Sequence, residues 1–286
     1  MAQRSTDITP HGAAHPRPRR LLSGPLRGKQ PFPKAPPAFT RQSTTQATDK
    51  LDSHASAPTC RRCGQCCLKG GPALHDQDAG LVPGTLPLSR LCTFRAGEAV
   101  FDQPQGRVLP LEREIIKIKG LGDGRSAGLG GWACVLFDGR ARACSIHERR
   151  PAECRALFCE DTRGLVAMYA QGRLTRAGLL GQGHPALAVM AEHEALVPVG
   201  KIAELGAALR AGDTGSGEAG RELLAIAETD AAFRRLFAER VGIGPEYHDF
   251  FLGRGAAALF SAVGVALRTD VRTGLRVQPD PLWRTR

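Results

Sequence analysis

The sequence lacks the features that define several protein classes. It has no apolar run of the roughly 20 residues that a membrane-spanning helix requires, so we expect no membrane association. The longest apolar run, residues 255–267, is bracketed by Arg254 and Arg268 and predicts a buried helix. There are no repeats of the collagen, coiled-coil or solenoid type. With 42% hydrophobic and 23% charged residues, the 286-residue chain has the composition of a globular protein with one large domain or two small ones.

Several short motifs of the common enzyme classes are also missing. The chain has no H-E-x-x-H or P-loop sequence, and no C-x3-C-x2-C run of the kind that radical enzymes use. No phosphate-cradling helix signal follows the glycine-rich stretch 120–131, so we expect a loop there. Tyr247, His248 and Asp249 are adjacent, and adjacent side chains do not face each other on a helix. We therefore expect them at the surface rather than in an acid–base group.

The net charge of +11 is concentrated at one end of the chain. Residues 1–50 contain nine basic and two acidic groups, whereas the remaining 236 residues contain 30 basic and 26 acidic groups. Eight prolines between Pro10 and Pro37 oppose a packed structure, so we expect a disordered basic tail over residues 1–55. The rest of the chain is nearly neutral and holds only two Trp and two Tyr, which disfavours specific nucleic-acid binding.

The composition of this tail also bears on the compartment. It contains no apolar stretch of the kind that forms the centre of a secretory signal. It is rich in Arg and poor in acidic residues, as organelle transit peptides are, but its prolines oppose the amphipathic helix that such peptides need. We therefore expect a cytoplasmic protein.

Eight of the nine cysteines fall into two clusters. Disulfides need an oxidising compartment, to which nothing in the sequence directs the chain, and a thioredoxin-like motif uses a single Cys pair. With disulfides and a redox pair disfavoured, the two clusters favour metal ligation. Cys92 stands apart among apolar neighbours, and we expect a small buried side chain there rather than a ligand. The clustered residues, which we predict to be metal ligands, are Cys60, Cys63, Cys66, Cys67, Cys134, Cys144, Cys154 and Cys159.

The spacing in the first cluster, Cys-Arg-Arg-Cys-Gly-Gln-Cys-Cys, limits how a metal can be bound. A C-x2-C turn lets two thiolates face one ion at about 2.3 Å, and a distant pair completes a tetrahedron. The C-x2-C-x2-C spacing also matches the first three ligands of a bacterial iron–sulfur run. Cys66 and Cys67 are adjacent, however, so their side chains diverge. The doublet therefore predicts two metal positions, or one polynuclear site with ligands on two sides.

The second cluster begins with a predicted β-hairpin. Residues 132–137 are strand-like, and Asp138-Gly139 is a strong turn signal. With a three-residue loop over 138–140, Cys134 lies opposite Cys144 with about 5 Å between the Cβ atoms, a good separation for two ligands of one ion. A two-residue turn would instead send Cys144 to the other face. A shared site therefore predicts the three-residue loop.

A helix is predicted next to Cys154. Pro151 suits the first helical position and Glu153 the third, and the positive end of the helix favours a thiolate at Cys154. Cys159 follows about 140° further around a regular helix, so either the helix ends before Cys159 or the two cysteines serve different positions. Nearby arginines could offset the negative charge of bound thiolates or be solvated surface residues; they are Arg61, Arg62, Arg149, Arg150 and Arg155.

These segments resemble the YkgJ-type CxxCxxCC family of cysteine-cluster proteins. Residues 60–67 match its opening motif. Residues 144–159, Cys-Ser-Ile-His-Glu-Arg-Arg-Pro-Ala-Glu-Cys-Arg-Ala-Leu-Phe-Cys, match its closing pattern C-x-I-Y-x-x-R-P-x-x-C-R-x-x-x-C. The resemblance covers roughly residues 58–165 and implies that the eight clustered cysteines chelate zinc or iron. The chain departs from the family at His147, where the family usually has Tyr, and we expect a substituted surface aromatic there rather than an extra ligand.

The remainder of the chain has mainly helical patterns. Thr229-Asp230 resembles the start of a helix, and residues 271–277 around Thr273-Gly274 predict a small hairpin. We expect an α+β fold, with a cysteine-cluster metal-binding domain over residues 56–165 and a helical region packed on it over residues 166–286. The predicted helices are residues 186–195, 201–210, 221–228, 231–241, 245–252 and 255–267.

The sequence thus supports a metal-binding protein that holds zinc, iron or an iron–sulfur cluster. An enzyme is a second hypothesis, because flagellin lysine N-methylases resemble the same cysteine cluster. As an enzyme, this protein would modify protein lysines or transfer electrons. A zinc-ribbon-like nucleic-acid binder is a third hypothesis. The expected partner is a metal ion, and a protein substrate or partner is left open.

Overall fold

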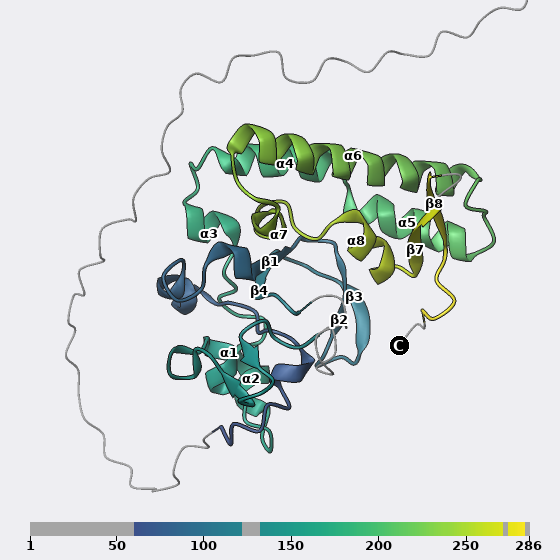
Figure 1. The fold of residues 1–286 in the computed structure, drawn as a ribbon. Coiled ribbons are helices and arrows are strands. Elements are labelled where there is room, and N and C mark those ends of the chain that lie inside the picture. The colour runs from purple at the N-terminus through teal and green to yellow at the C-terminus, as the bar shows by residue number, and fades with distance from the viewer. Residues whose placement is uncertain (1–59, 122–131, 271–273, 284–286) are drawn as a thin grey trace, which may run out of the picture. The chain divides into compact units, whose positions relative to one another are not determined.

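The structure is a computed structural model, and it describes residues 60–121, 132–270 and 274–283 (Figure 1). All of these residues belong to one unit of the chain, residues 56–286. The predicted basic tail over residues 1–55 lies outside the described residues, as does most of the glycine-rich stretch 120–131.

The β-structure consists of antiparallel two-stranded pairs. In the first pair Leu91, Ile116 and Ile118 are almost fully buried, as expected for apolar residues in a strand that packs on a core. The segment 115–118 is therefore a strand. The pairs are β1 (Leu91–Phe94) with β4 (Ile115–Ile118), β2 (Ala99–Asp102) with β3 (Arg107–Pro110), β5 (Phe137–Asp138) with β6 (Ala143–Cys144), and β7 (Val265–Asp270) with β8 (Gly274–Pro279).

Helices dominate the C-terminal half, so the predicted α+β class is confirmed (Figure 1). Short 3₁₀-helices are Cys67–Lys69, Asp76–Leu81, Leu88–Arg90, His147–Arg149 and Pro245–Tyr247. The α-helices of the described residues are α1 (Ala152–Ala156), α2 (Arg163–Met168), α3 (Arg176–Leu180), α4 (Ala186–Leu196), α5 (Val199–Arg210), α6 (Glu218–Val241), α7 (His248–Phe251) and α8 (Ala256–Ala262). No helix in this described part of the chain is long and apolar enough to cross a membrane.

The prediction of two helices over residues 221–241 was wrong, because α6 runs through Thr229 and Asp230 without a break. Asp230 does not cap its own helix. Its carboxylate instead accepts hydrogen bonds from His193 on α4 and from the backbone N–H of Ala256 on α8. The apolar face continues on both sides of Asp230, with Leu223 buried before it and Phe237 after it. In the sequence, Asp230 therefore resembled the N-cap of a new helix, although its hydrogen-bond partners lie on other helices.

The helix predicted over residues 255–267 is also shorter than expected. It ends at Ala262, and Gly264 adopts a φ of +75°, a conformation that glycine tolerates better than other residues. The chain then enters β7, so the terminal hairpin begins earlier than predicted. Its turn, residues 271–273, lies outside the described residues.

Two clusters of buried apolar side chains form the core. The first belongs to the C-terminal half, where α6 packs against α5 and α8. The second combines both halves: Cys134 and Phe137 of the cysteine-rich segment share it with Phe237 and Phe250 of the helical half.

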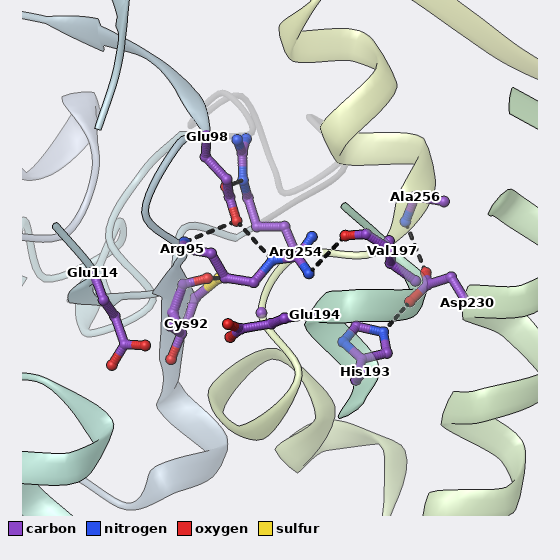
Figure 2. A network of polar contacts seen from close by, with 12 residues as sticks. Cys92, Arg95, Glu98, Glu114, His193, Glu194, Val197, Asp230, Arg254 and Ala256 are labelled. Atoms are coloured by element: carbon purple, nitrogen blue, oxygen red, sulfur yellow. Dashed lines mark hydrogen bonds and ion pairs between the residues drawn. The ribbon is translucent and has the colours of Figure 1, made fainter. Parts of the chain in front are cut away.

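A buried polar network lies beside these apolar clusters and links β1 and β2 to the helices (Figure 2). Arg95 and Glu98 are almost completely buried, and the backbone N–H of Arg95 donates to Glu98 Oε1 over 2.9 Å. Glu98 Oε2 accepts from Arg254 Nε over 2.8 Å. An unpaired buried charge costs several kcal/mol. These pairings therefore allow the charged side chains of Arg95 and Glu98 to be buried.

Candidate metal centre

The first cysteine cluster is a tight loop with left-handed backbone. Arg62 has a φ of +55° and Gly64 a φ of +79°. The backbone N–H of Arg62 donates to Cys60 Sγ over 3.4 Å, which helps to fix the start of this loop. A Cβ atom at Gly64 would lie 2.6 Å from Cζ of Phe137, so the loop is pressed onto that ring. Glycine is therefore required at residue 64 for both conformation and space.

The predicted pairing of the hairpin was wrong. Cys144 pairs with Phe137, not with Cys134, because the loop has four residues, 139–142. Asp138 Oδ1 closes this loop by accepting from the backbone N–H groups of Arg140 and Ala141 over 2.8 and 3.1 Å.

Cys134 instead belongs to a turn that interrupts the expected strand. The backbone N–H of Phe137 donates to the carbonyl of Cys134 over 2.9 Å, which forms the turn. The N–H of Cys134 donates to the carbonyl of Cys67 over 2.7 Å, and Cys134 forms a β-bridge with Gly120. The backbone thus joins the two cysteine clusters directly.

The helix beside Cys154 forms as predicted but is short. Pro151 is its N-cap rather than its first helical residue, and α1 ends at Ala156. Of the two alternatives for Cys159, the structure therefore shows the first, in which the helix ends before that residue. This end allows the chain to turn Cys159 towards the same cavity as Cys154.

Seven of the eight predicted ligands line one cavity of about 40 Å³. Cys134 is buried and does not line it. None of the nine cysteines, all within the described residues, forms a disulfide. Cys92 is buried in β1 and lies outside the cavity wall, as expected. The seven residues are Cys60, Cys63, Cys66, Cys67, Cys144, Cys154 and Cys159.

The sulfur atoms share this cavity without being grouped for coordination. Within residues 60–121, 132–270 and 274–283, no three Cys, His, Asp or Glu side chains are placed so as to hold one metal ion. A cysteine side chain has one rotatable bond, so its sulfur moves between staggered positions without a change in backbone. The donor set, made almost entirely of thiols, fits a thiophilic metal such as zinc or iron.

The thiols in the cavity influence one another strongly. A hydrogen bond with the Cys67 thiol lowers the pKa of Cys66 to about 6, and the same contact raises the pKa of Cys67. Burial, followed by the neighbouring Cys134, Cys66 and Cys144, raises the pKa of Cys154. Each thiolate in such a cluster opposes the ionisation of its neighbours. A bound cation would offset this repulsion and stabilise the cluster.

These interactions divide the cysteines into two groups. Cys134 and Cys144 both raise the pKa of Cys67 and that of Cys154, and we call Cys67, Cys134, Cys144 and Cys154 the inner group. Desolvation, followed by Cys63, Cys66 and Cys60, raises the pKa of the exposed Cys159; Cys60, Cys63 and Cys159 form the outer group. Cys66 interacts with members of both groups.

The polar side chains around the cavity are largely paired. His147 lines the cavity, and Arg150 Nη1 contacts its ring. Arg142 has a φ of +50°, and its side chain donates to the carbonyl of Cys63 over 3.0 Å. Among the described residues, Arg62 and Arg142 are the only non-glycine residues with positive φ, and both line this cavity. Unfavourable backbone of this kind is often found at functional sites.

Three of the flanking arginines have carboxylate partners, and the longest of these pairs joins Arg155 to Asp78 at 4.0 Å. Arg62 pairs with Glu148 at 2.9 Å, and Arg61 pairs with Glu160 at 2.5 Å. The latter two pairs are exposed and so contribute little to stability.

The surface position predicted for Tyr247, His248 and Asp249 was wrong for the histidine. His248 is buried edge-on against Phe237, with 6.1 Å between the ring centroids. Asp249 pairs with Lys119 at 2.9 Å, so the adjacent residues have separate partners and form no acid–base group.

Sequence reasoning missed the residues that hold α1 in place. Asp78 lies in the first turn of the 3₁₀-helix Asp76–Leu81, and its carboxylate accepts from the N–H of Ala152 on α1. Glu153 accepts from the N–H of Ala73 over 2.7 Å. No signal in the sequence pairs residues so far apart.

Comparison with known proteins agrees with this geometry. Residues 59–167 match the family model CxxCxxCC, described as a "putative zinc- or iron-chelating domain". The matched segment contains all eight clustered cysteines. Neither a curated protein nor a solved structure matches the chain. Residues 59–167 therefore match the CxxCxxCC domain family, and this match supports metal binding.

Proposed function

We propose that this protein binds zinc or iron through the thiolates of its eight clustered cysteines. The observation that carries the proposal is the shared cavity. Segments 60–67 and 144–159, far apart in sequence, supply seven of the eight cysteines to it. Cys134 is linked to this set by its backbone hydrogen bond to Cys67.

The division of the cysteines supports two ion positions. The inner group of Cys67, Cys134, Cys144 and Cys154 supplies four thiolates. The outer group of Cys60, Cys63 and Cys159 becomes four when Cys66 joins it. Two tetrahedral sites filled by thiolates leave no position open for a substrate, which is typical of structural or chelating metal sites rather than of catalytic ones. The comparisons lend no support to the enzyme reading through flagellin lysine N-methylases.

Compartment and domain organisation are part of the same proposal. Unpaired cysteines as metal ligands suit a reducing compartment such as the cytoplasm. We place the metal-binding domain at residues 56–165 and a helical region at residues 166–286. The support for their packing together is the core that Cys134 and Phe137 share with Phe237 and Phe250.

The decisive experiment is purification without oxygen, followed by elemental analysis and an absorption spectrum. We expect bound metal: a colourless zinc protein, or a brown iron–sulfur protein that absorbs visible light. Replacement of each clustered cysteine by Ser should lower the metal content, whereas Cys92→Ser should not. Protein that stays metal-free after anaerobic incubation with zinc and with ferrous iron plus sulfide would contradict the proposal, as would loss of metal in Cys92→Ser.

A further inference from the structure

The carboxylate of Asp78 joins two segments of the cysteine-rich region. It is completely buried in the 3₁₀-helix Asp76–Leu81. Its Oδ2 accepts from the backbone N–H of His75 over 3.0 Å, and its Oδ1 accepts from that of Ala152 over 2.9 Å. Ala152 is the first residue of α1, two residues before Cys154. The N-cap of this helix, Pro151, has no side chain that could cap it, so the cap comes from Asp78.

Glu153 attaches the same helix to the same segment. Its Oε2 accepts from the N–H of Ala73 over 2.7 Å, and its Oε1 forms an ion pair with Arg173. The segment that receives these contacts is itself fixed, since Leu74 donates to the carbonyl of Ile116 in β4 over 2.8 Å. Helix α1 is therefore anchored to a core strand by two carboxylates.

Helix α1 needs such anchors because it has only five residues. Isolated helices shorter than about 12 residues are marginal in water, and α1 buries only Ala152. Cys154 lines the cavity from this helix, so its position depends on where α1 is held.

We propose that Asp78 and Glu153 are positioning residues of the metal centre, which fix α1 and thereby orient Cys154 towards the other cysteines. This inference rests on the proposed function. Hydrogen bonds behind metal ligands commonly set ligand orientation, and their loss lowers metal affinity about 10-fold to 100-fold. Asn at residue 78 keeps one acceptor oxygen for two N–H donors, so one of the two segments is released. Gln at residue 153 removes the charge that faces Arg173.

The buried polar network around Arg95 offers a matched control for each substitution (Figure 2). Asp230 is also buried, and its Oδ2 accepts from the N–H of Ala256, the first residue of α8, over 2.8 Å. Glu98 is also buried, and it accepts from a backbone N–H and from an arginine, as Glu153 does. None of the eight clustered cysteines lies on α6 or α8, which Asp230 joins, or in the turn between β1 and β2, which holds Glu98.

The experiment is an anaerobic titration of the full chain with Co²⁺, a spectroscopic substitute for zinc, followed through thiolate-to-cobalt charge-transfer absorption. Stability to urea is measured in parallel. We expect D78N and E153Q to bind Co²⁺ about 10-fold to 100-fold more weakly than the unchanged protein, with a weaker charge-transfer band because Cys154 is no longer held towards the ion. D230N and E98Q should lose stability but keep the affinity and the band.

The readouts separate the two proposals. If the unchanged protein gives no thiolate-to-cobalt band, the proposed function fails, and this inference fails with it. If it gives the band and both D78N and E153Q keep its intensity and affinity, the positioning role alone is wrong. The role is also wrong if D230N and E98Q weaken binding as much as their counterparts do. Should D78N not fold, E153Q measured against E98Q decides the question by the same two readouts.

Discussion

The cysteine-rich region and the helical half of this protein are held together in different ways. Around α5, α6 and α8, fully buried apolar side chains such as Ile202, Leu223 and Phe260 form a continuous core. In the loop 60–70, by contrast, only Gly64 is buried. The conformation there depends on backbone hydrogen bonds and, in our proposal, on bound metal, and the neighbouring helix α1 is held by the buried carboxylate of Asp78. The helical half has a core that does not require metal.

Removal of the metal should produce the largest difference between the two regions. A chelator should release residues 60–70 and 132–160 from protection against amide hydrogen exchange, while α5 and α6 keep theirs. Structural zinc contributes about 10–16 kcal/mol of apparent binding free energy in small zinc domains, so its loss should open the region that it holds. Hydrogen exchange with mass spectrometry measures both regions in one sample. Equal loss of protection in both would show that the contrast is wrong.

The converse change removes an apolar side chain from the helical half. Phe260→Ala empties a fully buried site, and we expect the free energy of unfolding to fall by about 3–5 kcal/mol. Metal content per folded chain should stay the same, because Phe260 belongs to the apolar cluster that contains no cysteine. Denaturant unfolding and elemental analysis test the two statements separately, and reduced metal content in the folded fraction would contradict the second.

A smaller effect is expected where the cysteine loop meets the hairpin. Gly64→Ala forces a side chain into a φ of +79° and against the ring of Phe137, which should cost about 1–3 kcal/mol and weaken metal binding. Gly242→Ala is the control, because Gly242 has a φ of +72° with open space around it at the end of α6. It should lower stability through backbone strain alone. Unchanged metal affinity in Gly64→Ala would mean that the loop conformation does not matter for binding.

The smallest predicted effect concerns pH and the helical half alone. Burial lowers the pKa of His193, although its hydrogen bond with Asp230 acts in the opposite direction. Since the unfolded chain takes up the proton first, stability should fall as the pH drops below the ordinary histidine value of about 6.5, by up to about 1.4 kcal/mol for each unit of pKa depression. His193→Gln should flatten this part of the stability profile between pH 7 and 5. Denaturant unfolding across that range measures it, and a profile of unchanged slope would contradict the assignment.

The sequence predicted features that depend on local pattern and missed those that depend on distant partners. Helices α4 and α5 lie close to their predicted bounds because their helical spacing is local. The break predicted at Asp230 does not exist, since its partners His193 and Ala256 are remote in sequence. The hairpin register also failed, because the side chain of Asp138 closes a longer loop than the turn signal indicated.

For the candidate site, the choice of cysteines came from their clustering and from the family resemblance, and seven of the eight line one cavity. The contact between Asp78 and Ala152 spans 74 residues and follows no spacing rule. The anchoring of α1 could therefore be found only in the folded chain.

X-ray absorption at the metal edge tests the central claim most directly, on the full chain isolated without oxygen. We predict a coordination shell of sulfur atoms only, about four per metal ion, at about 2.3 Å. A shell dominated by nitrogen or oxygen atoms would contradict a centre built from the eight cysteines.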